Sequence, residues 1–89
     1  MNEKVRTSLP TNDVLIVDDE TDTLEMLTDL LHMCQTETAQ DFETAAQLLK
    51  QNPYDMAVLD IMGVQGYDLL EIANHNDIPA LIITAHALT

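Results

Sequence analysis

The sequence predicts an α/β fold in which a parallel sheet lies between two layers of helices. Short apolar runs rich in branched residues recur at Val14–Val17, Met56–Leu59 and Ala80–Thr84, and none shows the polar alternation of a strand with one wet face. Segments with apolar residues at helical spacing lie between the runs, so the order is strand, helix, strand, helix, strand, helix, strand. Right-handed crossovers make that order a three-layer α/β/α sandwich.

The first half of the chain begins with a polar leader, Met1–Asn12, which we expect to be flexible and outside the fold. The first apolar run then forms the central strand, covered on both faces. Leucines at spacings of three and four predict an amphipathic helix over 21–32, capped by Thr21 or Asp22. The next segment, Thr36–Ala39, combines β-branched threonines with a charge, which is typical of an exposed edge strand.

The second half of the chain follows the same alternation. Asp41 precedes an apolar stripe at helical spacing, and its side chain can accept the first free amide hydrogens of a helix that ends before Pro53. After the second apolar run, a loop with two glycines leads to a short helix over Tyr67–Ala73. Asn74–Asp77 is a turn before the last apolar strand. One small domain, 13–89, accounts for all of these elements.

The charge of the chain restricts the partners that it can have. Its 89 residues carry a formal net charge of -13, with only Lys4, Arg6 and Lys50 positive. Nucleic acid and anionic membranes are therefore poor partners, because both require clustered basic groups. We see no apolar stretch long enough for a membrane span or a signal peptide. The lone Cys34 suits a reducing compartment, so we expect a cytoplasmic domain.

Three carboxylates stand where two of the predicted buried strands end. Asp18 and Asp19 follow the first run, and Asp60 follows the second. Since the carboxyl ends of parallel strands meet at one edge of a sheet, the three acids would share one small volume. Like charges held that close raise one another's proton affinity unless a cation lies among them, and carboxylate oxygens suit Mg²⁺. An acidic pair alone is more often a helix cap with a solvated neighbour, and it is Asp60 that favours a metal site.

Three segments resemble the receiver domains of two-component response regulators: VLIVDDE at Val14–Glu20, AVLDIM at Ala57–Met62 and LIITAHA at Leu81–Ala87. The resemblance covers nearly everything from Asn12 to Thr89. It implies a flavodoxin-like parallel sheet and makes 13–89 a partial receiver domain. The family continues with a further helix, strand and helix, so we expect this sequence to lack the usual last helix-strand-helix.

The resemblance also implies roles for the acids. Asp60 matches the aspartate that takes a phosphoryl group from a partner histidine kinase, through nucleophilic attack by its carboxylate. Asp19 matches a direct Mg²⁺ ligand, and Asp18 matches the neighbouring acid that holds the metal through water. Met62 would lend its backbone carbonyl. These oxygens suit a hard cation that offsets the charge of the incoming phosphoryl group.

Two further matches and two departures follow from the same resemblance. Thr84 matches the switch hydroxyl that hydrogen-bonds the phosphoryl oxygen, and Ala85 matches the small residue that keeps the pocket accessible. The family's lysine, at the end of a fifth strand, has no counterpart before Thr89, so phosphoryl transfer should be slowed. The loop after Asp60 has five residues before Gly66 where the family usually has seven, which could shift the metal-ligating carbonyl.

Three functions are compatible with these features. The leading one is a phosphoacceptor that a sensor histidine kinase or phosphotransfer protein modifies at Asp60, which makes the domain a switch and not an enzyme. A haloacid dehalogenase-type hydrolase also uses a strand-end aspartate with Mg²⁺, but it requires a second aspartate where Met62 stands. A receiver-like interaction module without phosphorylation is the third. In all three, the apolar strand Ala80–Thr84 would be an open edge, so we expect self-association through it.

Overall fold

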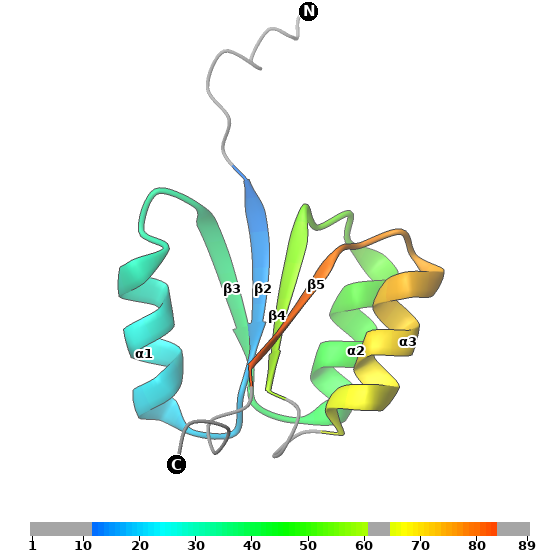
Figure 1. Cartoon of the computed structure of the whole chain (residues 1–89), viewed down its shortest axis with the longest axis horizontal. Helices are drawn as coiled ribbons and strands as arrows, with labels where there is room; N and C mark the ends of the chain where they lie inside the picture. The colour runs from blue at the N-terminus through cyan, green and yellow to red at the C-terminus, as the bar shows by residue number, and fades with distance from the viewer. Residues whose placement is uncertain (1–11, 61–64, 84–89) are drawn as a thin grey trace, which may run out of the picture.

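A four-stranded parallel sheet forms the middle layer of the molecule. The computed structural model describes residues 12–60 and 65–83. The strands lie in the order β3-β2-β4-β5, with bounds β2 (Asp13–Val17), β3 (Gln35–Ala39), β4 (Met56–Asp60) and β5 (Ala80–Ile83). Helix α1 (Thr21–Leu30) covers one face, and helices α2 (Phe42–Gln51) and α3 (Gly66–His75) cover the other (Figure 1). The predicted three-layer α/β/α sandwich is confirmed.

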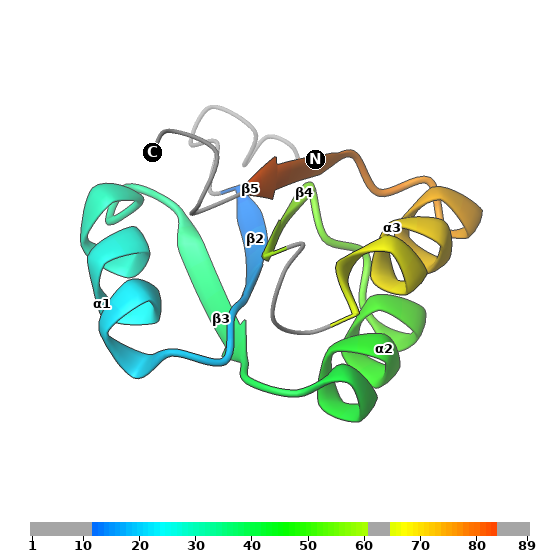
Figure 2. The same cartoon turned by 60° about the horizontal axis from the view of Figure 1, so that its bottom comes forward.

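The central position of β2 follows from its composition. Its burial pattern is exposed at Asp13 and buried at the four residues that follow, as expected for a strand with a neighbour on each side and a helix layer on each face. It pairs in parallel with β3 on one side and β4 on the other. Val17 lies opposite Leu59, so β2 and β4 reach the same edge of the sheet. Figure 2 brings this carboxyl edge forward and shows the sheet between its two helical layers.

Side chains of successive strand residues alternate between two separate apolar clusters. The larger cluster lies under α2 and α3 and includes Leu15, Val17 and Leu59, all fully buried. The smaller one lies under α1 and consists of the buried residues Val14, Ile16, Leu24 and Val58. Because a strand alternates its side chains between faces, the same apolar run supplies both clusters.

The cap of α2 is as predicted, whereas the cap of α1 is not. The Asp41 carboxylate accepts the Thr44 amide hydrogen at 2.8 Å, and this bond lowers the pKa of Asp41. For α1 the residue before the first helical turn is Glu20, whose side chain makes no capping bond. The predicted cap at Thr21 or Asp22 was wrong, because Thr21 already lies in the helix and its hydroxyl instead accepts a hydrogen bond from Gln40 at 3.0 Å.

Two helix ends also differ from the predictions. Helix α1 stops at Leu30, short of the expected residue 32, because the His32 amide bonds the carbonyl three residues back, on Asp29, at 3.3 Å. Helix α3 instead runs on through Asn74 and His75, where the sequence predicts a turn. It ends where Asp77 takes a left-handed backbone conformation, with φ of 59°.

Within residues 12–60 and 65–83, no helix has both the length and the apolar character needed to cross a bilayer.

Candidate metal centre

The structure brings three carboxylates together at the carboxyl edge of the sheet. One oxygen from each of Asp18, Asp19 and Asp60 lies within 4.8 Å of the other two. The reason is the register: Asp18 follows Val17 directly, and Val17 lies opposite Leu59, the residue before Asp60. A further bond holds the turn, since the Asp18 amide donates to the Ala39 carbonyl at 3.1 Å. Two neighbouring strands therefore deliver their acids to one place.

The burial of these acids is unequal. Asp18 and Asp60 keep only 7% and 8% of their surface exposed, whereas Asp19 is exposed. Burial raises the pKa of Asp18, and the negative charges of Asp60 and Asp19 raise it further. The Glu20 amide, which donates to the Asp18 carboxylate at 2.9 Å, opposes this change. The net effect is a carboxyl group that holds its proton more strongly than usual.

Basic side chains are scarce in the described part of the chain, which contains one lysine, Lys50, and no arginine. Lys4 and Arg6 lie in the leader, outside the described residues. Lys50 lies in the last turn of α2, roughly 12 Å along the helix axis from Phe42, which follows the carboxyl end of β3. The three grouped carboxylates thus give this edge of the sheet an acidic character.

The donor set fits a divalent cation with a preference for oxygen. Three carboxylates, two of them buried, offer hard oxygen ligands that lie within 4.8 Å of one another, as a small oxygen-ligated cation such as Mg²⁺ prefers. A cation would also remove the repulsion that raises the pKa of Asp18. The chemistry of the pocket thus supports Mg²⁺ at this edge.

Three of the predicted site residues cannot be placed. Met62, Thr84 and Ala85 lie outside the described residues, and their roles stay predictions. One conformation at the start of α3 was not predicted from the sequence. Gln65, which precedes the helix, has a left-handed backbone with φ of 46°. Its side chain donates to Asp68 at 3.1 Å. Glutamine is not a residue that favours this conformation, so the sequence offered no signal.

Fold and pocket together define an α/β domain with a cluster of three carboxylates at a sheet edge. Within that class the assignment is specific, because the sequence profile of the response regulator receiver domain matches residues 14–89. The chain belongs to the response regulator receiver family, and the resemblance drawn from the three motifs is confirmed.

Solved structures agree with this assignment. The N-terminal domain of a response regulator receiver protein from Methanoculleus marisnigri JR1 has a TM-score of 0.75 and 30% identity, over 88% of this chain and 70% of that one. The Francisella response regulator 1452 receiver domain has the same TM-score and 28% identity, over 88% and 69%. NtrX from Brucella abortus is 28% identical with a TM-score of 0.75, but this chain spans only 20% of it. Among curated proteins, none matches.

Proposed function

We propose that this chain is a phosphoacceptor in two-component signalling. A sensor histidine kinase or phosphotransfer protein would transfer a phosphoryl group from its phosphohistidine to Asp60. The observation that carries the proposal is the meeting of Asp18, Asp19 and Asp60 in one pocket of a receiver-family domain. In this role the domain is a cytoplasmic switch and not an enzyme.

The transfer requires a carboxylate that can reach the donor phosphorus. An Asp60 oxygen attacks phosphorus, the nitrogen–phosphorus bond of the phosphohistidine breaks, and its electron pair stays on the imidazole nitrogen. The product is an acyl phosphate on Asp60. Mg²⁺, held by Asp18 and Asp19 beside Asp60, would neutralise charge on the phosphoryl oxygens. Because metal ligands must be ionised, the raised pKa of Asp18 makes protons compete with the metal.

Three further residues enter the proposal through the family resemblance. Met62 would add its backbone carbonyl to the metal, Thr84 would hydrogen-bond the phosphoryl oxygen, and Ala85 would keep the pocket accessible. Phosphorylation adds a charge of about -1.5 to -2 to the pocket. By moving to hydrogen-bond the phosphoryl oxygen, the Thr84 hydroxyl would couple the pocket to the surrounding surface.

A second candidate is a receiver-like interaction module that is not phosphorylated. It is supported by the small number of basic residues, three in the whole sequence, that could pair with a phosphoryl group. The loop between Asp60 and Gly66, shorter than is usual in the family, supports it too. The match to the receiver family argues against the haloacid dehalogenase-type hydrolase.

Self-association is a further part of the proposal. Among the described strands, β5 lies last in the sheet, and it consists only of apolar residues. Leu81 within it is 55% exposed, and Ile82 and Ile83 are half-buried. An apolar strand at an edge tends to pair with another copy.

Titration with Mg²⁺ and beryllofluoride, a mimic of the acyl phosphate, tests the phosphoacceptor role. A response regulator of similar fold, MaeR, has been solved bound to beryllium trifluoride. We expect Mg²⁺-dependent binding by calorimetry that is lost in Asp60→Asn. Asp77→Asn is the matched control, because it removes the same charge from an exposed turn whose left-handed backbone asparagine tolerates. If Mg²⁺ binds but beryllofluoride does not, the unphosphorylated module is the better assignment.

A further inference from the structure

We propose that the open edge of β3 is a docking site for an extended basic segment of a partner protein. The segment would add to the sheet as a fifth strand, beside α1 and at the far side of β3 from β2. Docking of this kind is distinct from phosphoryl transfer and does not require a modified Asp60.

The backbone of β3 is open on one side. The strand is first in the sheet order and pairs only with β2 within the described chain. The Gln35 amide donates to the Asn12 carbonyl at 2.8 Å, and the Ala39 carbonyl accepts from Asp18 at 3.1 Å. Because alternate residues of a strand direct their backbone groups to opposite sides, those of Thr36 and Thr38 point outward. An incoming strand could bond both residues.

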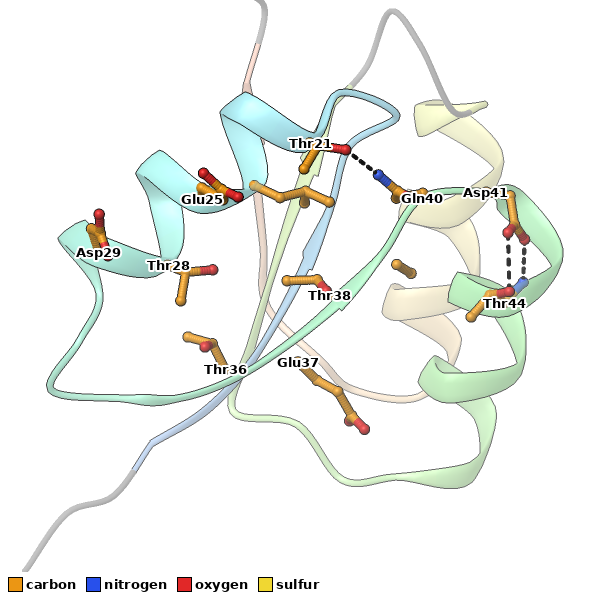
Figure 3. A pocket seen from close by; sticks show the side chains of 12 residues that line it. Thr21, Glu25, Thr28, Asp29, Thr36, Glu37, Thr38, Gln40, Asp41 and Thr44 are labelled. Atoms are coloured by element: carbon orange, nitrogen blue, oxygen red, sulfur yellow. Dashed lines mark hydrogen bonds between the residues drawn. The ribbon is translucent and has the colours of Figure 1, made fainter.

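A groove of about 910 Å³ runs beside this edge. In Figure 3, Thr28 on α1 lies across it from Thr36 and Thr38 on β3, and Glu25 and Asp29 line its α1 side. Its size falls in the range of ordinary ligand pockets, so it can take several side chains of an added strand. The threonine hydroxyls can each donate and accept, which suits polar side chains.

The charge of the groove selects the ligand. Four of its lining residues are acidic and none is basic. Two of the four already have partners: Asp41 accepts from Thr44, and Glu37 accepts from the Tyr54 hydroxyl. The other two, Glu25 and Asp29, are exposed on α1. A basic ligand would meet these two carboxylates first.

The spacing of Glu25 and Asp29 matches that of a strand. Four residues of helix rise by about 6 Å, and two residues of strand by roughly 6.6 Å. Basic side chains at alternate positions of an added strand could therefore each approach one carboxylate. A second copy of this chain fits poorly, since its own net charge is -13 and its other edge strand, β5, has no charge to offer. The matching partner is thus a segment in which Lys or Arg alternates with β-branched residues.

Binding of a short probe to the full chain tests this site. The probe is a labelled acetylated hexapeptide amide of alternating Val and Lys, and the readouts are fluorescence anisotropy and amide hydrogen exchange. We expect saturable binding with protection of the Thr36 and Thr38 amides. The double variant Glu25→Gln with Asp29→Asn should weaken binding about fivefold, as two exposed ion pairs would. Glu43→Gln with Glu71→Gln removes the same charge elsewhere and should change it less than twofold.

Three results would overturn the assignment. The first is equal binding of a probe whose alternate backbone amides are N-methylated, because attraction by charge alone would then suffice. The second is an unchanged affinity in the groove variant. The third is binding that appears only after Lys4→Gln and Arg6→Gln are introduced in the full chain, since the leader of the chain would then be the occupant in place of a partner. Each of these readings is independent of whether Asp60 is phosphorylated.

Discussion

The two faces of the sheet are covered unequally, although the same strands supply both. Among the residues that the structure describes, twelve form one buried cluster under α2 and α3, whereas four do so under α1. The register shows where the second face is incomplete: Leu81 lies opposite Val58, yet Val58 is 2% exposed and Leu81 is 55% exposed. Covering by helices, and not the apolar character of the strand, therefore decides which side chains are buried.

The difference has consequences for stability and for binding. A domain of this size has a small margin of stability, of about 4–13 kcal/mol. Most of the apolar burial lies on the face with two helices, so that face should carry most of the margin. The face with one helix also exposes Met26 and Leu30 on α1, at 53% and 64%. Mutations on the face covered by α2 and α3 should therefore mainly change stability, and mutations on the face covered by α1 should mainly change binding to other molecules.

The largest effect is expected from truncation in the larger cluster. Leu59→Ala removes a fully buried side chain and should lower the free energy of unfolding by about 3 kcal/mol. Leu27→Ala, at a half-buried position of the smaller cluster, should cost only about 1 kcal/mol. Urea unfolding followed by circular dichroism gives both values. Equal losses would contradict the unequal division of the core.

A gain of stability is expected at the entry to α3. Gln65 has a left-handed backbone, which costs a residue with a Cβ about 1 kcal/mol more than glycine. Gln65→Gly should therefore stabilise the domain by roughly that amount, less the loss of the bond to Asp68. Glu71→Gly, in the middle of α3, is the control and should destabilise by about 1 kcal/mol. A loss at both positions would show that the backbone at Gln65 carries no cost.

A smaller effect on stability is expected from Asp18, at the carboxyl edge of the sheet. The pKa of Asp18 is raised in the folded state, so its contribution to stability is complete below the unfolded pKa and is lost as pH rises through the folded pKa. Without metal, Asp18→Asn should raise Tm at pH 7 by about 2–5 °C and leave it nearly unchanged at pH 3. Thermal unfolding across that pH range, with and without Mg²⁺, measures this. An equal rise at both pH values would argue for packing instead of charge.

The smallest effect on stability, and a large one on assembly, is expected at the exposed position of β5. Leu81→Lys should change the free energy of unfolding by less than about 0.5 kcal/mol, because the side chain is mostly in solvent already. It should abolish concentration-dependent self-association measured by sedimentation velocity, because a charge on an edge strand opposes pairing. A compact monomer of the unaltered chain at high concentration would refute the association itself.

Elements that are marked by a run of several residues could be predicted from the sequence more accurately than features that depend on one residue. The buried strands were predicted to within a residue at each described end, because a short apolar run without polar alternation is typical of a strand inside a parallel sheet. The carboxyl ends of α1 and α3 were not, because they depend on single contacts. The His32 amide bonds the Asp29 carbonyl after α1, and Asp77 takes a conformation that aspartate only sometimes adopts.

The same distinction holds for the pocket. Asp18, Asp19 and Asp60 could be grouped in advance, since strand ends and parallel pairing dictate where they lie. The unequal burial of Asp18 and Asp19 could not be predicted. The two residues are neighbours in sequence, and the direction in which the chain turns after β2 decides which of their side chains is buried.

What the sequence by itself determined is the order of the elements, the parallel sheet and the acids at its carboxyl edge. These follow from local patterns and from the chirality of the chain. Only the tertiary structure decided that Glu25 and Asp29 line a groove beside the open edge of β3, and that Leu81 lies uncovered on the face of α1. Those features depend on how far one helix extends over a sheet, which is set by packing between residues distant in the chain.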